Sequence, residues 1–319
     1  MLEGRLIGVF GTDAGAKAGL LGPLTKRSEA EGIVVHRRVE SGMNYSFLDD
    51  AHFPEKVQGY SRIASIADRA IYVLPKSAKI AAPDGELAVV IDSFGLDGSM
   101  VSVDEEPPAG IGAYFKGTRI EGFASEPRSS LSSVIDLSAV GSGPNVPTKG
   151  TLVYIDRAFS VKGVGVVALG FVLGGTVSVH DELRLIPGDG KTAEVRGIQV
   201  SDVDHESVGR GLRVGLSLKG LDVDDLDKVS WMDDGTFDVA DRLSFEFKQS
   251  RFYRQGVEGR DMHLQLPGVI LTCRLESGAP GTLVASLPSG APVWRGMRVG
   301  VVDLNGKGLR VAGGGVCSL

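Results

Sequence analysis

The sequence has few cysteines and histidines, and this excludes the commonest metal and disulfide sites. Its 319 residues contain two cysteines, Cys273 and Cys317, which form no C-x-x-C pair and have no histidine at ligand spacing. Neither a zinc site nor a disulfide framework is therefore expected, and a reducing compartment fits this usage. The five histidines form no H-x-x-x-H or H-E-x-x-H pair, so we predict no metal site and no catalytic triad.

Long apolar runs are also missing. No stretch approaches the 18 apolar residues of a membrane span, and the first ten residues lack the basic start and long apolar core of a signal peptide. The net charge of −6 argues against a general nucleic-acid coat. We therefore expect a cytoplasmic, monomeric protein that binds neither a membrane nor DNA.

Charge is spread unevenly along the chain. Residues 241–319 hold ten Lys and Arg against six Asp and Glu, whereas residues 151–240 hold nine against fifteen. Such asymmetry points to an acidic partner or an RNA partner for the last segment.

Glycine is abundant, with 45 residues in 319, and one run stands where a phosphate-binding loop would stand. Residues 11–18 read Gly-Thr-Asp-Ala-Gly-Ala-Lys-Ala and follow an apolar strand. A working loop reads G-x-x-x-x-G-K-[ST]: backbone N–H groups surround phosphate oxygens, the Lys reaches the outer phosphates and the hydroxyl binds Mg²⁺. Here Gly11 and Lys17 have the right spacing, but Ala16 replaces the second Gly and Ala18 replaces the hydroxyl.

Residues 1–140 alternate strand-like and helix-like stretches, which predicts an α/β domain with a mostly parallel sheet. The expected strands are Leu6–Phe10, Ile33–Val39, Ala70–Leu74, Leu87–Ile91 and Arg119–Phe123, and the expected helices are Ala16–Glu31, Glu55–Ala67 and Ser129–Leu137.

Residues 141–150 are dense in Gly and Pro and are predicted to be a linker. Beyond them, short Val- and Leu-rich strands recur at roughly ten-residue spacing between glycine turns, the pattern of β-barrels. A composition change near Gly235 and the charge switch divide this part in two. We therefore expect one barrel over residues 151–235 and a second over residues 236–319.

The first of these barrel segments resembles the second domain of translational GTPases. The resemblance rests on IDRAFSVKGVGVVALG at Ile155–Gly170 and LGGTVSVHDEL at Leu173–Leu183, and it continues in order through Val195–Val200, Gly209–Leu216 and Leu218–Gly220. It is similar above all to SelB and its archaeal SelB-like relatives, with elongation factor Tu further off. The resemblance implies a P-loop-GTPase-like α/β domain followed by two β-barrel domains, one of which holds the aminoacyl end of tRNA.

The nucleotide motifs that the resemblance implies are nevertheless absent. No Thr occurs between Thr25 and Thr118 to sense the γ-phosphate, and no Pro-Gly precedes the linker to form the second switch. Asn44 is the only Asn before the linker, so no Asn-Lys-x-Asp reads guanine. We interpret Gly11, Asp13, Lys17, Asp49 and Asp97 as the inactive remnant of a nucleotide site, with Asp97 standing after the expected strand Leu87–Ile91.

Basic residues interleaved with aromatic ones in the last segment are typical of RNA-contacting surfaces. Two further arginines, near a predicted hairpin of the first barrel, face either a tRNA end or an acid on the domain surface. The RNA-binding candidates are Arg210, Arg213, Arg251, Phe252, Tyr253, Arg254 and Arg260.

The leading hypothesis is a SelB-like translation factor that binds tRNA or aminoacyl-tRNA, or the ribosome, through its barrels. It would have little or no GTP binding or hydrolysis, no catalytic residue and no cofactor; GTP or GDP with Mg²⁺ would bind only if the family activity persists. One alternative is a working GTPase with divergent loops, in which Asp97 reads guanine. A second is a protein-interaction scaffold that regulates a true elongation factor.

Overall fold

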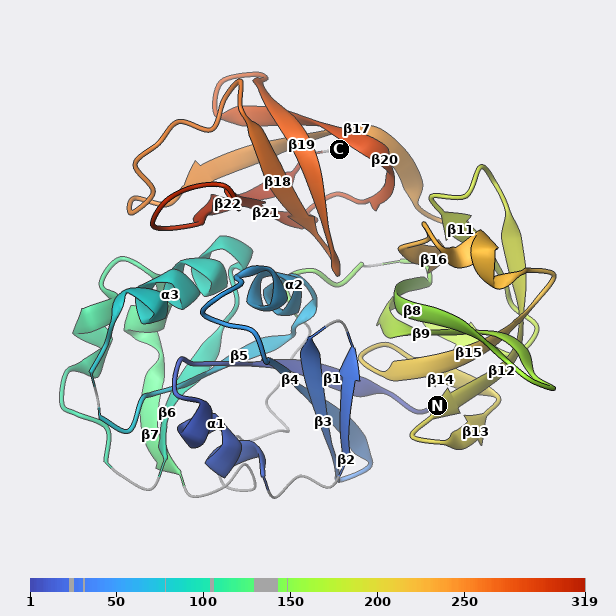
Figure 1. Cartoon of the computed structure of the whole chain (residues 1–319), viewed down its shortest axis with the longest axis horizontal. Coiled ribbons are helices and arrows are strands. Elements are labelled where there is room, and N and C mark those ends of the chain that lie inside the picture. The colour runs from blue at the N-terminus through green and yellow to red at the C-terminus, as the bar shows by residue number, and fades with distance from the viewer. Residues whose placement is uncertain are drawn as a thin grey trace.

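The computed structural model describes residues 1–319 except 23–25, 31, 78, 104–105, 129–142, 148 and 319. The chain forms an α/β domain followed by two β-barrels (Figure 1). Buried residues from all three parts join one hydrophobic cluster, so the parts share a core. No helix in the described part of the chain has the length and apolar character needed to cross a membrane.

The α/β domain is built on a seven-stranded sheet of order β2-β3-β4-β1-β5-β6-β7. The four pairings from β4 to β7 are parallel, whereas β2–β3 and β3–β4 are antiparallel. The mostly parallel sheet is therefore confirmed. Its strands are β1 (Gly4–Phe10), β2 (Lys26–Ala30), β3 (Ile33–Glu40), β4 (Met43–Asp50), β5 (Arg69–Val73), β6 (Gly98–Val103) and β7 (Ala124–Arg128).

Several predicted elements of this domain differ from the structure. The first helix, α1 (Ala14–Leu21), stops at Gly22, and strand β2 occupies part of the helix expected to reach Glu31. The strand expected at Arg119–Phe123 is a 3₁₀ turn, η2 (Arg119–Gly122), after another, η1 (Ile111–Phe115). Strands β4, β6 and β7 were not predicted, and the helix expected at Ser129–Leu137 lies outside the described residues. Helix α2 (Gln58–Ile66) lies within the expected span.

The predicted strand at Leu87–Ile91 is wrong, because these residues lie in helix α3 (Ala82–Phe94). Asp84 begins this helix by accepting a hydrogen bond from the Ala81 N–H at 2.9 Å, and Gly95 ends it in the left-handed conformation with φ +65°. The helix is apolar on more than one side because it is covered on more than one side. A short apolar run of this kind does not distinguish a buried strand from a buried helix.

The first barrel closes through the pairing of β11 with β12 in a sheet of order β11-β16-β8-β9-β15-β12-β13, beside a small β10–β14 ribbon. Its strands are β8 (Leu152–Val161), β9 (Gly165–Gly174), β10 (Thr176–Ser178), β11 (Glu182–Ile186), β12 (Thr192–Val200), β13 (Val203–His205), β14 (Ser207–Gly209), β15 (Arg213–Lys219) and β16 (Trp231–Asp233), with a 3₁₀ turn η5 (Val223–Leu226).

The second barrel is closed and antiparallel, with strand order β17-β20-β19-β18-β21-β22. Its strands are β17 (Asp238–Gln249), β18 (Asp261–Leu266), β19 (Val269–Ser277), β20 (Thr282–Val293), β21 (Arg298–Val302) and β22 (Val311–Cys317). The prediction of an α/β domain followed by two β-barrels is thus confirmed.

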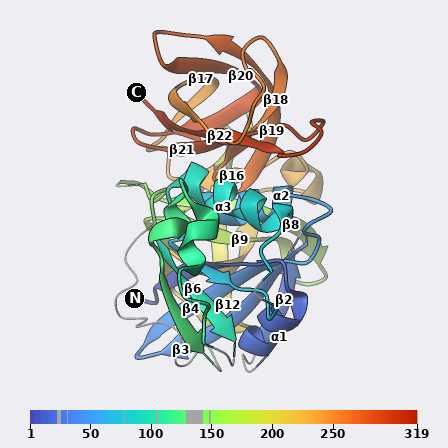
Figure 2. The ribbon, with the colours of Figure 1, turned by 90° about the vertical axis from the view of Figure 1, so that its left-hand side faces the viewer.

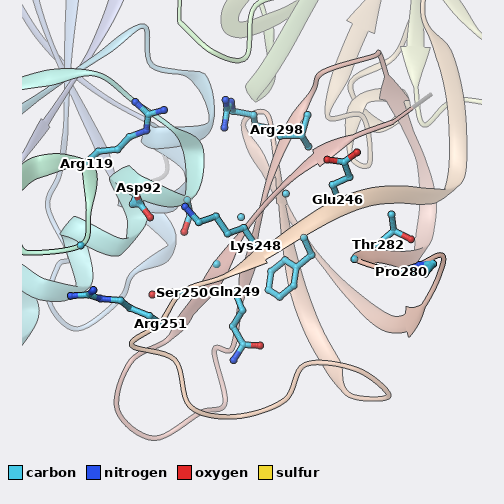
Figure 3. A pocket seen from close by; sticks show the side chains of 18 residues that line it. Asp92, Arg119, Glu246, Lys248, Gln249, Ser250, Arg251, Pro280, Thr282 and Arg298 are labelled. Atoms are coloured by element: carbon cyan, nitrogen blue, oxygen red, sulfur yellow. The ribbon is translucent and has the colours of Figure 1, made fainter. Parts of the chain in front are cut away.

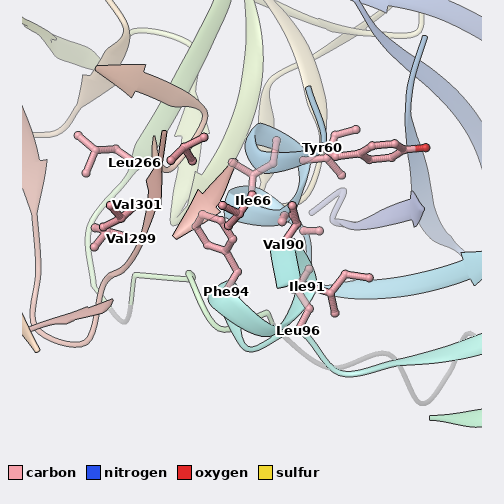
Figure 4. Packing of buried hydrophobic residues seen from close by; sticks show 14 of the residues in the cluster. Tyr60, Ile66, Val90, Ile91, Phe94, Leu96, Leu266, Val299 and Val301 are labelled. Carbon is pink, nitrogen blue, oxygen red and sulfur yellow. The ribbon is translucent and has the colours of Figure 1, made fainter. Parts of the chain in front are cut away.

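Helices α2 and α3 lie between the α/β sheet and the second barrel (Figure 2). Phe94 and Ile66 of these helices meet Leu266 and Val299 of the barrel in one buried cluster (Figure 4). The glycine-rich strand β22 lets α3 approach the barrel backbone directly: a Cβ on Gly314 would lie 2.0 Å from the Ser93 carbonyl oxygen. The unusual glycine content is therefore used in part to seat a helix on a strand.

The segment predicted as a linker is docked where the structure describes it. The buried Asn145 amide donates to the Ser65 carbonyl of α2 at 2.9 Å and to the Arg298 carbonyl of β21 at 3.0 Å, and its oxygen accepts from the Arg298 N–H at 2.7 Å. Near it, the buried Asp68 carboxylate accepts from the Gly143 N–H and pairs with Arg210 of the first barrel. These residues bind the three parts to one another.

We predict that Gly314→Ala destabilises the protein by about 1–3 kcal/mol, because the added methyl group must push α3 off β22. Urea unfolding midpoints measure the effect. Gly85→Ala in α3 is the control. A Cβ at Gly85 meets nothing within 4 Å, so this substitution should leave stability unchanged or raise it by up to about 1 kcal/mol. Equal losses in both variants would contradict this contact.

Candidate functional site

The loop after β1 lies at the sheet edge where ligands bind in α/β proteins. The parallel strands β1, β4 and β5 end together there, and this carboxyl edge is the usual binding crevice of such sheets. Gly11 follows β1 and packs closely against Val73: a Cβ at this position would lie 2.8 Å from the Val73 carbonyl oxygen. Asp13 caps α1 by accepting from the Ala16 N–H at 2.9 Å, and its other carboxylate oxygen accepts from the Lys76 N–H at 3.1 Å. These hydrogen bonds lower the pKa of Asp13.

Lys17 turns inward from this loop, and its side chain is engaged within the protein. It is 6% exposed, and its Nζ donates to Asp49 Oδ1 at 2.6 Å and to the Tyr60 hydroxyl at 2.7 Å. The Tyr60 hydroxyl in turn lies 2.8 Å from Asp49 Oδ1. Burial raises the pKa of Tyr60 well above its ordinary value, so the phenol stays protonated and donates to the carboxylate. We call these three residues the lysine cluster.

The ring of Tyr60 anchors the lysine cluster in the core. It is fully buried on α2, stacks on Phe10 at 5.0 Å between ring centroids and meets the edge of Phe53 at 5.2 Å. Figure 4 shows its hydroxyl directed away from the barrel residues Leu266 and Val299. The ammonium of Lys17 is therefore held by one group from helix α2, Tyr60, and one from strand β4, Asp49.

A second carboxylate adds negative charge beside the lysine cluster. Asp50 is buried, its Oδ1 accepts from the His52 N–H at 2.8 Å, and its Oδ2 has no hydrogen-bond partner among the described residues. Burial raises the pKa of Asp50, and the neighbouring Asp49 acts in the same direction. The single cation of the loop thus faces two acids, which opposes the entry of a phosphate.

Asp97 stands at the opposite edge of the sheet from Lys17. Because residues 87–91 are helical, Asp97 precedes strand β6 instead of following a strand, and its carbonyl accepts from the Ala70 N–H at the start of β5. Its carboxylate pairs with Arg119 at 2.7 Å on the surface. The expectation that placed Asp97 near a guanine base rested on the wrong strand, and the structure does not bring it to the remnant site.

The two arginines of the first barrel among the RNA candidates form internal ion pairs. Arg210 pairs with the buried Asp68 of the α/β domain. Arg213 is 7% exposed; it pairs with Asp156 at 3.0 Å and lies over the Phe171 ring at 5.8 Å. Sequence alone left a tRNA end and a surface acid open as partners, and in both cases the structure shows an acid.

The basic and aromatic candidates of the second barrel divide into inward and outward groups. Tyr253 is buried and donates to Asp303 Oδ2 at 2.7 Å, and Arg260 pairs with the same carboxylate at 3.0 Å. Arg251, Phe252 and Arg254 are exposed. The outward group follows the end of β17 and borders the α/β domain.

A cleft of about 660 Å³ lies between α3 and the second barrel, next to this outward group (Figure 3). Its charged lining consists of the cations Arg119, Lys248, Arg251 and Arg298 and the acids Asp92 and Glu246.

Sequence analysis missed Arg119, Lys248 and Arg298, although the basic last segment signalled two of them. It also missed Tyr60, which no local pattern connects with Lys17. Within the described residues, no group of His, Cys, Asp and Glu is arranged to hold a metal.

Comparison with known proteins identifies the fold. No protein-family model matches the chain. The crystal structure of the translation elongation factor SelB from Methanococcus maripaludis, in complex with the GTP analogue GppNHp, superposes with a TM-score of 0.77 over 100% of this chain and 80% of that one, at 17% identity. The chain therefore has the fold of the SelB elongation factors, as the resemblance predicted.

Sequence comparison gives similarity of two kinds. An uncharacterized protein of Methanocaldococcus jannaschii is 26% identical over 98% of this chain and 99% of its own length. The selenocysteine-specific elongation factor of the same organism is 28% identical over 130 residues, which are 38% of this chain and 28% of that factor. Similarity to SelB in sequence is thus partial, whereas similarity in fold extends over the whole chain.

We predict that the lysine cluster is a coupled, stabilising unit. Lys17→Met and Asp49→Asn should each lower the free energy of unfolding by about 3 kcal/mol, because each leaves a largely buried group without its partner. The double variant should lose clearly less than the sum of the two. Thermal and urea unfolding of the four proteins measures this.

The exposed pair Lys191–Asp225 is the matched control, since it has the same residue types at 2.5 Å but side chains that are 49% and 26% exposed. Lys191→Met and Asp225→Asn should each leave the unfolding midpoints nearly unchanged, because exposed ion pairs contribute little to stability. Additive effects at Lys17 and Asp49, or losses as small as in the control pair, would contradict the coupling.

Proposed function

We propose that this protein is a SelB-like translation factor that binds tRNA or ribosomal RNA and has lost GTP binding and hydrolysis. The proposal combines the elongation-factor fold with a phosphate-binding loop whose cation, Lys17, is already hydrogen-bonded within the protein. In it, the α/β domain is a rigid platform for the two barrels, and binding to RNA takes place without a nucleotide switch.

The observation that carries the proposal is the internal use of Lys17. A phosphate entering the loop must compete with Asp49 and Tyr60 for the ammonium, at 2.6 and 2.7 Å. A charge-assisted hydrogen bond contributes about 1.5–3 kcal/mol. The missing base-reading Asp and Mg²⁺ hydroxyl therefore weaken nucleotide binding by roughly 10²–10⁴, before the lysine is released.

The alternative of a working GTPase with divergent loops is supported less well. It needs a carboxylate near the base, and the candidate Asp97 is paired with Arg119 at the far edge of the sheet. The third hypothesis, a scaffold that contacts only protein, stays as an outcome of the experiments below. RNA is favoured because the outward group of the second barrel presents Arg251 and Arg254 around the exposed Phe252.

We predict that isothermal titration with GTP or GDP in the presence of Mg²⁺ detects no binding tighter than about 1 mM, which corresponds to about −4 kcal/mol. Lys17→Met is the control for any weaker signal: heat that persists in this variant does not depend on the Lys17 ammonium. Micromolar affinity that disappears in Lys17→Met would establish a working nucleotide site and overturn the loss of GTP binding.

We also predict that the protein binds tRNA, and that binding weakens steeply as salt rises because phosphate contacts release counterions. Arg254→Glu should weaken binding by about tenfold or more, since it replaces a phosphate contact by a repulsive charge. Electrophoretic mobility shifts between 50 and 300 mM salt measure both effects.

Arg274→Glu is the matched control, because it changes the net charge equally at an exposed position of β19 outside the outward group. Equal weakening by both variants would show a general charge effect. The absence of tRNA binding at low salt would favour the protein scaffold instead.

A further inference from the structure

Two exposed aromatic side chains from distant parts of the chain line one groove. Tyr114 of η1 is 69% exposed and Phe252 of the second barrel is 43% exposed. Both line a groove of about 430 Å³ whose lining also includes Ala82, Ala88 and Val89 of α3. Exposed aromatics that gather in a groove mark binding surfaces, whereas single ones are ordinary.

Arg251 joins this groove to the neighbouring cleft, because it lines both. Its guanidinium lies 4.8 Å from the Phe252 ring centroid and donates to the Lys116 carbonyl at 2.7 Å. It is seated on Gly117, where a Cβ would lie 2.2 Å from the Arg251 Cζ. The aromatic groove and the charged cleft therefore adjoin at Arg251, and together we call them the groove–cleft surface.

The cleft half of this surface holds more positive than negative charge. Arg119, Lys248, Arg251 and Arg298 line it against two acids, in a protein whose net charge is −6, and Arg119 also pairs with Asp97 outside the lining. Lys248 is exposed, and no ion pair to it is found in the part of the chain that the structure describes. Burial and the neighbouring Arg119 lower the pKa of Arg298, as expected when cations crowd together. An anionic ligand would relieve this crowding.

We propose that the groove–cleft surface binds single-stranded RNA, with bases stacked on Tyr114 and Phe252 and the backbone phosphates held by Lys248, Arg119 and Arg298. Stacking platforms beside a positively charged groove are the means by which unpaired strands are bound without sequence preference. The proposal rests on the proposed function, because it takes RNA as the ligand. It adds that the protein recognises an unpaired segment of that RNA.

A single strand fits these observations better than a duplex or an acidic peptide. Tyr114 and Phe252 both line the groove with exposed rings, and only unstacked bases offer their own faces to such rings. An acidic peptide matches the cations of the cleft but gives the aromatic rings no comparable partner. An aromatic groove beside a cationic cleft therefore points to a ligand that carries both flat bases and phosphates.

The test is fluorescence anisotropy with a labelled ten-nucleotide oligouridine, a base-paired RNA hairpin without unpaired ends, and polyglutamate as competitor. We expect the oligouridine to bind and Tyr114→Ala and Phe252→Ala each to weaken it by about 5- to 100-fold, the effect of losing one stacked base. Lys248→Gln should reduce the slope of log affinity against log salt by about 0.7. Circular dichroism and unfolding midpoints verify that the variants are folded.

Phe159→Ala and Lys162→Gln on the first barrel are the matched controls, since Phe159 is 36% exposed and Lys162 is exposed. They should leave oligouridine binding unchanged. Equal binding of hairpin and oligouridine, no effect of the aromatic variants, or displacement by polyglutamate at lower concentration than by RNA would each overturn the proposal. Binding of tRNA measured in parallel separates the outcomes: tRNA binding without oligouridine binding refutes this surface alone, whereas loss of both refutes the proposed function.

Discussion

The ion pair of Lys17 with Asp49, closed by the Tyr60 hydroxyl, constrains the rest of the molecule because Tyr60 belongs to α2. The same helix carries Ser65, whose carbonyl accepts from Asn145 and whose hydroxyl accepts from the Gly268 N–H of the second barrel at 3.0 Å. Releasing the lysine for a ligand breaks its hydrogen bonds to Asp49 and Tyr60 and leaves the Asp49 carboxylate without its cation. Helix α2 therefore contacts the loop at one edge of the sheet and also the linker and the second barrel.

Further contacts fix this assembly in one arrangement. Arg310, which lies between β21 and β22, donates hydrogen bonds to the Glu86 carboxylate of α3 and to the Pro54 and Glu55 carbonyls. Trp231 of the first barrel donates to the Pro267 carbonyl of the second barrel at 2.8 Å. Removing one partner of a buried ion pair strongly destabilises a protein, because the other charge is left buried without its partner. A platform joined by such contacts suits a factor that binds RNA without a nucleotide-driven rearrangement, which is the function proposed above.

Much of the fold was predictable from the sequence, but the candidate site was predictable only in outline. Apolar runs located β1, β3 and β5, and the ordered motif between residues 155 and 220 predicted the barrel. Helix α3 was misread because the barrel covers the side that would otherwise be polar. Lys17 was identified from its spacing, whereas its partner Tyr60 lies 43 residues away and follows only from the packing of α2. Arg210 and Arg213 look like surface charges in the sequence, but their acids, Asp68 and Asp156, lie in other segments.

The most direct test of the account is ¹⁵N NMR of the Lys17 ammonium group, assigned by comparison with Lys17→Arg. We expect slowly exchanging ammonium protons, because the ammonium is largely buried and donates hydrogen bonds to Asp49 and Tyr60, and we expect no change when millimolar GTP and Mg²⁺ are added. Rapidly exchanging protons, or a chemical-shift change that saturates at micromolar GTP, would show a lysine available to phosphate and contradict the account.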